Sequence, residues 1–411
     1  MKILYLHQYY LPPGGSGNDR SRSLAAYWTQ QGAEVSVVTS TASFPAGWQQ
    51  RLGAELLEGG IYRYRDGQVN VYVLDVPYNH MMRYSSRVQA FIEFYRKILR
   101  ALPRLPRPDI IYASSTPPCV GEAGRQAARK WKLPFIFETV DVWPDVPKGM
   151  GIIRNPLLLY WLDSRVNRIY SESSHVAALS PGMRDQVLSH GVDPNKVTVS
   201  FNGTDIDRFV PSASKPDGPA IVLYAGTVGV ANDVSQVVRV AKMLESEPDI
   251  VFHVLGNGND FPRVKAVADE VKPTNLKFLP PVPKEEVGRL FAEASIGVVC
   301  FAPYPVLEAN SANKYYDYCA CGVPVVINYG GWQADALRAN DAGLSSPMGD
   351  LAAFANNIRT LGRDPAMRKR MGENARTLAC REYDRRQIAA DLLKIMDNVL
   401  SGRRSRELQP S

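Results

Sequence analysis

The stretch NSANKYYDYCACGVPVVIN, residues 310–328, joins a polar and aromatic segment to an apolar run through a Gly-x-Pro sequence. Ser311 is a suitable N-cap, and Gly322 followed by a proline is typical of a helix end. We therefore expect a helix over 312–320 that leads directly into a buried strand over 323–328. A helix feeding a strand in this way is the building unit of an α/β domain.

The same helix carries groups that suit an anionic ligand. Its first turn leaves the amides of Ala312, Asn313 and Lys314 unpaired, where the helix dipole favours an anion, and the side chain of Lys314 adds a full positive charge. The spacing puts Asn313, Lys314 and Asp317 on one face. Phosphate would bind at the helix tip, while Asp317 would accept hydrogen bonds from a ribose diol. The pattern fits a nucleoside diphosphate, and a capped surface helix with a local Lys–Asp pair is the alternative.

Composition limits the class of protein. The chain of 411 residues is 45% apolar and 22% charged, which is typical of a globular protein with two domains. No apolar run reaches about 18 residues and the first ten residues do not form a signal peptide, so we expect a cytoplasmic protein. Five scattered cysteines and five histidines without metal-binding spacing predict no disulfide, metal or cofactor.

The net charge of +7 is compatible with an anionic small substrate or an anionic membrane surface. Nucleic acid is not expected as a partner, because the sequence has no helix-turn-helix, zinc-finger or RNP-like pattern.

Apolar runs alternate with amphipathic segments along the whole chain. In the first half we expect strands at 2–7, 34–40, 69–76, 109–115, 134–140 and 174–180, and helices at 20–31, 84–102 and 120–131. In the second half we expect strands at 220–226, 249–256, 276–280, 296–301, 323–328 and 342–346, and helices at 233–246, 260–270, 284–294, 312–320, 351–362 and 365–380.

A stretch rich in Gly, Pro, Ser and Asp at 201–219 separates these two series and is interpreted as an interdomain linker. The sequence thus predicts two Rossmann-like α/β domains, at 1–200 and 220–380. Residues 381–411 are expected to form a C-terminal helix that can cross back to the N-terminal domain, followed by a frayed tail.

Glycines occupy strand-to-helix turns in both halves. Gly14 and Gly15 follow the first strand, and Gly226 and Gly229 follow the first strand of the second half, with Gly256 in a similar turn. Such turns let backbone amides approach a phosphate or a sugar, although plain turn geometry explains them as well. None has the G-x-G-x-x-G spacing and there is no Walker A sequence, which argues against NAD enzymes and P-loop NTPases.

Motifs along the chain resemble retaining glycosyltransferases of family 4, which have the GT-B fold. They are the early Gly-Gly, SPGM (180–183), FNGTDIDRF (201–209), LYAGTVG (223–229), FLPPVPKEEV (278–287) and NKYYDYCACGVPVV (313–326). More narrowly, SSTPP (114–118) and FETVDVWPD (137–145) resemble the WbuB-like branch of bacterial surface-polysaccharide glycosyltransferases. The resemblance implies two facing Rossmann-like domains with a cleft between them, the N-terminal one binding the acceptor and the C-terminal one the nucleotide sugar.

The resemblance also implies roles for single residues. Asp317 takes the place of the glutamate that binds the ribose, and Lys314 matches the lysine of a related PSK pattern. Pro281 and Val282 fall where the family's backbone meets the base, and the Gly14 loop falls where it meets the phosphates or the acceptor. The implied donor-binding residues are Gly15, Gly226, Thr227, Gly229, Asn232, Gly256, Val282, Glu308, Asn310, Ser311, Ala312, Asn313, Lys314 and Asp317.

This chain departs from the donor-binding pattern at several positions. The family's usual Arg and Lys after the second-half glycine fall on Thr227 and Asn232, so Lys314 would carry more of the diphosphate charge. The first glutamate of the E-x7-E pattern would fall on Ala309. Either of the neighbouring residues, Glu308 or Asn310, could take the place of this glutamate.

The catalytic candidates are Glu138, Asp141 and Lys314. Glu138 and Asp141 are expected at a strand end facing the cleft, where either would position the acceptor or assist its proton; loop hydrogen bonding or a domain-interface salt bridge is the alternative. Trp143 and Gly14 are assigned to the acceptor side. Ser114 joins them, and because it stands where many relatives have a histidine, no histidine role is transferred.

The function implied by the resemblance is that of a retaining hexosyltransferase in bacterial polysaccharide or lipopolysaccharide biosynthesis. The donor would be a UDP-sugar, such as an N-acetylhexosamine or a deoxy derivative, and the acceptor a glycan or a lipid-linked sugar, without a metal ion. A GT-B nucleotide-sugar epimerase, a nucleotide-sugar-binding protein without catalysis and a nonenzymatic scaffold are the alternatives.

Residues 83–107 predict a basic amphipathic helix that suits an anionic leaflet, with 155–170 as a second contact. The expected apolar stripe consists of Val88, Phe91, Ile92, Tyr95, Leu99 and Leu102. The basic residues, set against the single acid Glu93, are Arg83, Arg87, Arg96, Lys97, Arg100, Arg104 and Arg107. The alternative is that the stripe packs into the N-terminal core and leaves the arginines in water.

Overall fold

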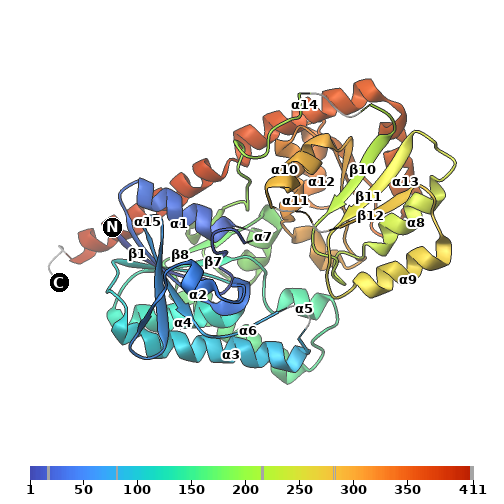
Figure 1. Cartoon of the computed structure of the whole chain (residues 1–411). Coiled ribbons are helices and arrows are strands. Elements are labelled where there is room, and N and C mark those ends of the chain that lie inside the picture. The colour runs from blue at the N-terminus through green and yellow to red at the C-terminus, as the bar shows by residue number, and fades with distance from the viewer. Residues whose placement is uncertain (16–18, 80–81, 214–216, 281, 283, 408–411) are drawn as a thin grey trace. The chain divides into compact units, whose positions relative to one another are not determined.

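The structure, a computed structural model, describes residues 1–15, 19–79, 82–213, 217–280, 282 and 284–407 (Figure 1). The chain divides into two compact units. Unit 1 is Met1–Phe201 with Arg386–Ser411, and unit 2 is Asn202–Arg385. Each unit contains a mainly parallel sheet with helices packed on it, so the predicted α/β class with two Rossmann-like domains is confirmed.

The described part of unit 1 has a nine-stranded sheet in the order β3-β4-β5-β2-β1-β6-β7-β8-β9. Its strands are β1 (Lys2–Leu6), β2 (Glu34–Ser40), β3 (Glu55–Leu57), β4 (Ile61–Asp66), β5 (Val69–Leu74), β6 (Ile110–Ser114), β7 (Phe135–Thr139), β8 (His175–Ala178) and β9 (Val197–Val199). The six predicted strands are confirmed and run parallel. The antiparallel hairpin of β3 and β4 was not predicted, because β4 is half polar and β3 has three residues.

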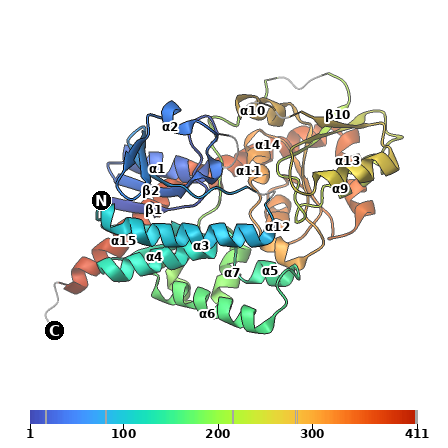
Figure 2. The same cartoon turned by 60° about the horizontal axis from the view of Figure 1, so that its bottom comes forward.

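Helices cover both faces of this sheet. They are α1 (Arg20–Gln30), α2 (Trp48–Arg51), α3 (Tyr84–Ala101), α4 (Pro118–Trp131), α5 (Asp145–Gly149), α6 (Pro156–Glu172), α7 (Pro181–Ser189) and α15 (Arg385–Glu407). Alternate residues of β1 enter two cores: Leu4 and Leu6 pack with α3, α4, α6 and α7, whereas Ile3 and Tyr5 pack with α1 and α15. Figure 2 shows α3, α4 and α6 on the same side of unit 1.

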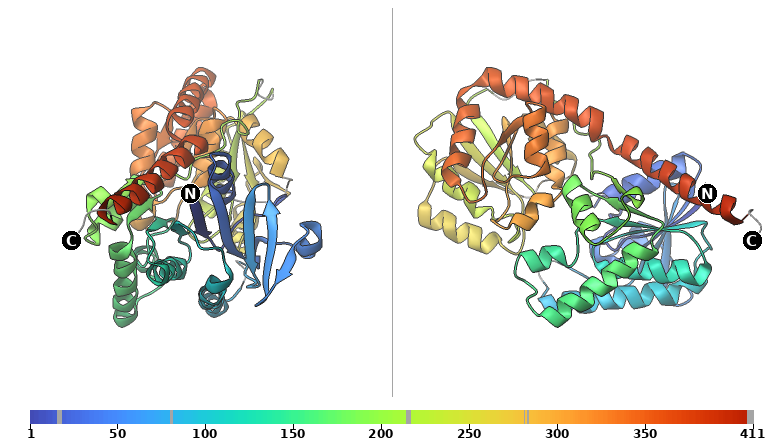
Figure 3. Two further views of the ribbon diagram at one scale, coloured as in Figure 1. Left: turned by 90° about the vertical axis from the view of Figure 1, so that its left-hand side faces the viewer. Right: turned by 180° about the vertical axis from the view of Figure 1, so that it is seen from behind.

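The C-terminal helix α15 supplies part of the second core of unit 1. Its buried residues Ile388, Ala389, Leu392 and Met396 pack with the α1 side of the sheet (Figure 3). The indole Nε1 of Trp28 donates a hydrogen bond to the carbonyl oxygen of Ala389 at 2.9 Å. A segment that follows unit 2 in the sequence therefore completes unit 1.

Unit 2 has a six-stranded parallel sheet in the order β12-β11-β10-β13-β14-β15 over its described residues. Its strands are β10 (Ala220–Ala225), β11 (Ile250–Leu255), β12 (Leu276–Leu279), β13 (Ile296–Val299), β14 (Val325–Ile327) and β15 (Gly343–Ser345). Its helices are α8 (Ser235–Met243), α9 (Phe261–Val271), α10 (Lys284–Glu293), α11 (Asn313–Ala320), α12 (Trp332–Ala339), α13 (Leu351–Arg363) and α14 (Pro365–Glu382). All elements predicted for this half are present, and α12 is additional.

Helix α11 differs from the prediction at its start. It begins at Asn313, with Ala312 rather than Ser311 in the N-cap position, and the hydroxyl of Ser311 pairs with that of Tyr316 at 2.6 Å instead of capping the helix. The predicted end is correct, since Gly322 adopts a φ of +64° that other residues rarely tolerate.

Helix α3 packs most of its predicted apolar stripe against the core of unit 1. Phe94 and Ile98 are in the core, as is Leu102 just after the helix, and Phe91, Tyr95 and Leu99 pack against it. Two residues of the predicted stripe stay exposed, Val88 and Ile92. The stripe therefore follows the alternative interpretation, in which it packs into the unit's own core. Over the described residues, no helix combines the length and the apolar character needed to cross a membrane.

Candidate functional site

Two glycine turns of unit 2 pack against each other at the carboxyl ends of β10 and β11. The amide of Gly226 donates to the carbonyl oxygen of Leu255 at 2.9 Å. A Cβ atom added at Gly256 would lie 1.8 Å from the carbonyl oxygen of Gly226, and one at Gly258 would lie 2.3 Å from that of Val228. These positions must be glycine, because any side chain would overlap the neighbouring backbone.

Lys314 extends from the first turn of α11 toward β10. Its Nζ lies 4.7 Å from the ring centre of Tyr224, and a Cβ atom at Gly226 would come within 2.9 Å of the lysine Cε. Burial lowers the pKa of Lys314, and the neighbouring Cys300 and Asp317 offset part of this decrease. An anion bound beside this ammonium group would therefore raise the pKa of Lys314.

Asp317 lies on the next turn of α11, on the face that carries Asn313 and Lys314. One of its carboxylate oxygens, Oδ1, accepts a hydrogen bond from the hydroxyl of Thr204 at 2.6 Å. Asp317 remains partly exposed. Thr204, at the start of unit 2, therefore orients the carboxylate for which a ribose-binding role is predicted.

The loop after β10 is closed by its own hydrogen bonds. The side-chain amide of Asn232 donates to the carbonyl oxygen of Thr227 at 3.1 Å, and the hydroxyl of Tyr224 donates to the same oxygen at 2.7 Å. The amide of Asn232 also donates to the carbonyl oxygen of Gly229 at 2.9 Å. Thr227 and Asn232 thus shape the loop beside Lys314, although neither brings a positive charge to it.

Glu308 belongs to the short 3₁₀ helix Pro305–Ala309, and its carboxylate reaches the turn that follows β14. Its Oε1 accepts a hydrogen bond from the amide of Gly330 at 3.2 Å. Asn310 contacts the same turn through its backbone, because its carbonyl oxygen accepts from the indole of Trp332 at 2.8 Å. Of the two candidates, Glu308 is the one whose side chain reaches this turn.

Val282 is partly exposed, beyond the end of β12, whereas Pro281 lies outside the described residues. Among the residues that the structure describes, no three His, Cys, Asp or Glu side chains are grouped so that they could hold a metal ion.

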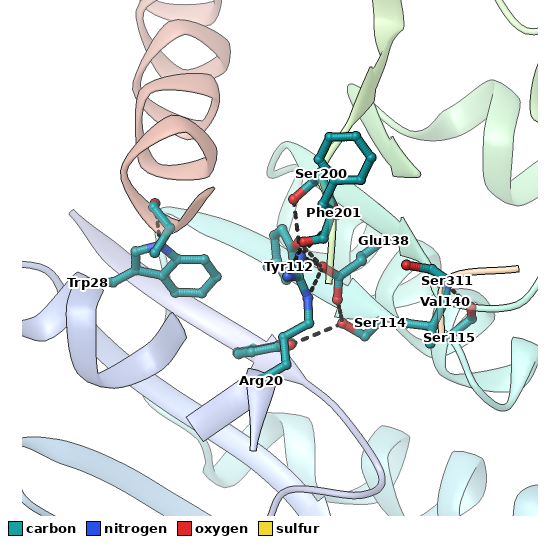
Figure 4. Close-up of polar contacts among 12 residues, drawn as sticks. Arg20, Trp28, Tyr112, Ser114, Ser115, Glu138, Val140, Ser200, Phe201 and Ser311 are labelled. Carbon is teal, nitrogen blue, oxygen red and sulfur yellow. Dashed lines mark hydrogen bonds and ion pairs between the residues drawn. The ribbon is translucent and has the colours of Figure 1, made fainter. Parts of the chain in front are cut away.

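In unit 1, Glu138 is enclosed by hydrogen-bond donors (Figure 4). It is 1% exposed, and its Oε1 accepts from Arg20 at 2.7 Å and from Tyr112 at 2.8 Å. Its Oε2 accepts from the hydroxyl of Ser114, which is also buried. Burial alone would raise the pKa of Glu138, but the Arg20 guanidinium and these hydrogen bonds lower it below its ordinary value.

This geometry corrects two expectations. Glu138 does not offer a free carboxylate to a substrate. The hydroxyl of Ser114 donates its hydrogen bond to that carboxylate and, being buried, does not face an acceptor. Arg20 in turn donates to the carbonyl oxygen of Phe201 at 2.6 Å and to the hydroxyl of Ser200 at 3.0 Å. The network therefore fixes the segment where the chain leaves unit 1. This agrees with the alternative interpretation of Glu138, in which the residue holds a loop by hydrogen bonds.

Asp141 remains a candidate for contact with a substrate. It is partly exposed, and its Oδ2 accepts from the hydroxyl of Thr116 at 2.7 Å. Burial of its carboxyl group raises the pKa of Asp141, and the hydrogen bond from Thr116 offsets part of the rise. Its neighbour Trp143 packs half-buried against the core of unit 1.

The glycine turn after β1 is only partly constrained. A Cβ atom at Gly14 would meet open space, although its φ of +75° favours glycine, whereas one at Gly15 would lie 2.7 Å from the side chain of Leu11. The predicted site residues thus form two groups, one in each unit. Four partners were not predicted, namely Thr204, Tyr224, Arg20 and Thr116, and of these all but Arg20 lie within motifs quoted in the sequence analysis.

Both halves of the chain match known protein families. Residues 15–203 match the family model of a glycosyl transferase 4-like domain, and residues 205–378 match that of the glycosyl transferases group 1. Together the two models cover most of the chain.

Individual relatives are more distant. The chain is 23% identical over 281 residues to a D-inositol 3-phosphate glycosyltransferase of Streptomyces bingchenggensis, a match that covers 62% of this chain and 59% of that protein. The match therefore spans less than two thirds of the relative's length.

Solved structures resemble the chain over nearly its whole length. Sucrose-phosphate synthase from Thermosynechococcus elongatus has a TM-score of 0.78 at 15% identity, covering 98% of this chain and 99% of that one. Anabaena Alr3699/HepE, solved in complex with UDP, has a TM-score of 0.70 at 18% identity, covering 97% and 100%. At these identities the likeness shows a shared fold.

Proposed function

The chain belongs to the GT-B glycosyltransferases through both of its matched domains, and on that premise we propose that it transfers a sugar from a nucleotide sugar to an acceptor. Unit 2 binds the donor and unit 1 the acceptor. The observation that carries this proposal is the convergence of Lys314, the Gly226 turn and Asp317 at the carboxyl ends of the unit 2 strands, where open α/β sheets bind ligands.

In the proposed complex the diphosphate lies at the first turn of α11 and beside Lys314. The helix amides and the ammonium group stabilise the charge that grows on the diphosphate as the glycosidic bond breaks. Bound diphosphate also reverses the effect of burial on Lys314, because a neighbouring anion raises the pKa of a lysine. Asp317, oriented by Thr204, accepts hydrogen bonds from the ribose.

We assign Glu308 to the place of the missing family glutamate, facing the hydroxyl groups of the donor sugar. Its support is the hydrogen bond between its carboxylate and the amide of Gly330, which holds the acid at the strand-end turn. Transfer proceeds with retention and without a metal ion, the leaving phosphate taking the proton of the acceptor hydroxyl.

For the donor we propose a uridine nucleotide carrying an N-acetylhexosamine or a deoxy derivative. The fold neighbour solved with UDP makes this nucleotide the first to test. For unit 1 we propose that Asp141 positions the acceptor hydroxyl next to Trp143, since its carboxylate is partly exposed and accepts from Thr116, whereas Asp145, the other partly exposed acid of the FETVDVWPD motif, is paired with His190. The acceptor is a glycan or a lipid-linked sugar of surface-polysaccharide synthesis, reached from the cytoplasmic side of the membrane.

The test is a thermal-shift screen of UDP, GDP, ADP and their sugars, followed by an assay of nucleotide release with and without lipid-linked acceptors. Ligand that binds the folded state raises the melting temperature, so UDP and one UDP-sugar should do so. Release that depends on an acceptor supports transfer. Epimerised donor without an acceptor would indicate an isomerase, and binding without turnover would indicate a protein that has lost catalysis.

A further inference from the structure

The first half of α6 exposes large apolar side chains to an unusual degree. Leu157 is 80% exposed, Tyr160 77% and Trp161 52%, and Ile152 in the preceding loop is 55% exposed. Scattered single apolar residues are normal on a protein surface, but a contiguous group marks a contact with a partner or a membrane. These residues therefore require an explanation in terms of binding.

The exposed first half of α6 is held in place at both ends of the helix. The second half of the helix is anchored, because Val166, Ile169 and Tyr170 are buried in the core of unit 1. At the start of the helix, the side chain of Asn155 accepts hydrogen bonds from the amides of Leu157 and Leu158. The apolar side chains are thus held out from unit 1 on a capped helix whose other end is fixed.

Positive charges flank the exposed apolar residues of this helix. Between residues 145 and 172 there are four basic side chains and three acids, and two of these acids are paired within unit 1, Asp145 with His190 and Glu172 with Arg125. The four basic side chains are all exposed, and they are Lys148, Arg154, Arg165 and Arg168. The guanidinium of Arg165 lies over the Trp161 ring at 5.3 Å, so positive charge and aromatic surface share one site.

We propose that the first half of α6, with Ile152, inserts into the headgroup and acyl boundary of an anionic phospholipid bilayer. Tryptophan and tyrosine favour this boundary because their rings are amphipathic, leucine favours its apolar side, and each nearby arginine gains attraction from anionic lipid. A protein partner would not require this excess of basic groups around an aromatic and aliphatic centre. The inference rests on the proposed function, since a lipid-linked acceptor is reached at such a surface.

The test is co-sedimentation with vesicles of equal parts phosphatidylglycerol and phosphatidylethanolamine. The triple variant Leu157→Ser, Tyr160→Ser and Trp161→Ser should bind about 100-fold more weakly, because the apolar area that enters the bilayer is lost. Leu56→Ser, at an exposed leucine of β3, is the matched control and should bind like the parent protein. Arg165→Glu should weaken binding and reduce its salt dependence, whereas Arg239→Glu on unit 2 should not.

Insertion itself is measured with brominated lipids that quench tryptophan. The parent protein should be quenched, and Trp161→Phe should keep its vesicle binding but lose most of the quenching. Unchanged binding by the triple variant, or quenching that survives in Trp161→Phe, would overturn the proposal. A triple variant that loses self-association in light scattering while keeping vesicle binding would assign this surface to a second copy of the chain instead.

Calorimetry with UDP separates this inference from the proposed function. The triple variant lies in unit 1 and should bind UDP like the parent protein. A chain that binds UDP but no vesicles would refute the membrane contact alone, whereas vesicle binding without any nucleotide binding would refute the donor site alone.

Discussion

At the scale of single residues, the absence of a side chain at Gly226 determines where Lys314 can lie. The lysine Cε occupies space that a Cβ atom at position 226 would enter, and the ammonium group reaches the face of Tyr224. A larger residue at 226 would displace the cation as well as strain the turn. The ammonium group that we propose to bind the diphosphate is therefore positioned by two residues that are distant in sequence, Gly226 and Lys314.

Asp317→Ala should weaken UDP binding by roughly 1.5–3 kcal/mol, the usual value of a hydrogen bond to a charged group. The measurement is isothermal calorimetry, with the melting temperature as a check that unit 2 stays folded. Asp335→Ala, at an exposed acid of α12, is the matched control. Equal UDP affinity in the Asp317 variant and the parent would remove the ribose role.

Lys314→Met should lower turnover more than it weakens nucleotide binding, because the diphosphate charge is greatest in the transition state. The free lysine has a lowered pKa and bound diphosphate would raise it, so binding takes up a proton only at pH values between the free and the bound pKa, and the affinity for UDP falls as pH rises past the free pKa. Calorimetry in two buffers of different ionisation enthalpy detects that proton. Lys369→Met, at an exposed lysine, should leave the uptake unchanged, and a proton uptake that persists in Lys314→Met would contradict the assignment.

Spacing within one helix was enough to put Lys314 and Asp317 on the same face, because helical geometry relates residues that are close in sequence. Their partners could not be found in this way. Thr204 is 113 residues away from Asp317, and Tyr224 comes from a strand rather than from the helix. The burial of Glu138 was missed for the same reason, since its partner Arg20 is separated from it by 118 residues.

At the scale of elements, the Arg20–Glu138 pair joins α1 to β7 inside unit 1. Arg20→Met should lower the free energy of unfolding by about 3–5 kcal/mol, because it leaves a buried carboxylate without its counter-ion. Adding Glu138→Gln should recover much of this loss, and denaturant unfolding measures both. Arg63→Met, which breaks an exposed ion pair with Glu55, should have little effect. A loss in Arg20→Met no larger than in that control would mean that the buried pair does not stabilise unit 1.

His190 joins three helices of unit 1. Its Nε2 pairs with Asp145 of α5 at 2.9 Å and its Nδ1 with Asn167 of α6 at 2.8 Å. The hydrogen bond to Asp145 raises the pKa of His190 above its ordinary value, despite partial burial. The stabilisation from the charged form is therefore complete below the unfolded pKa and is lost as pH rises through the folded one.

His190→Gln should consequently destabilise the protein more at pH 6 than at pH 9, with the pH values chosen to bracket the ordinary histidine pKa of about 6.5. Denaturant unfolding of the parent and the variant at both values gives the comparison. His253→Gln is the control with the opposite sign, since burial lowers the pKa of that histidine. A constant difference between parent and His190 variant across this range would show that the ion pair adds nothing.

Regular elements followed the hydrophobic pattern well, because buried parallel strands are continuous apolar runs that a sequence displays directly. The pattern failed where an element was short or where its two faces were both partly apolar. Strand β3 has three residues, and in α3 the pattern selected Val88 and Ile92, which the structure leaves exposed, while passing over Phe94 and Ile98. Only tertiary packing decides between two such faces.

At the scale of the whole molecule, the two units have separate cores and should unfold as separable bodies. Leu392→Ala, in the part of α15 that packs into unit 1, should lower the stability of unit 1 by about 2–5 kcal/mol. Five of the six tryptophans belong to unit 1, so tryptophan fluorescence follows that unit. UDP should instead protect unit 2.

Calorimetry with UDP should therefore find the donor affinity of Leu392→Ala close to that of the parent protein. Met243→Ala, at an exposed residue of unit 2, serves as the control and should leave the fluorescence transition in place. A fluorescence transition unmoved by Leu392→Ala would mean that α15 contributes nothing to unit 1.

The position of α15 has a consequence for how the protein is made. A ribosome delivers the first 201 residues of unit 1, then the whole of unit 2, and only afterwards the helix whose backbone accepts the indole hydrogen of Trp28. Domains generally fold as they emerge during synthesis. We therefore expect the nascent chain to carry an apolar face on its first domain that stays uncovered until α15 has been made.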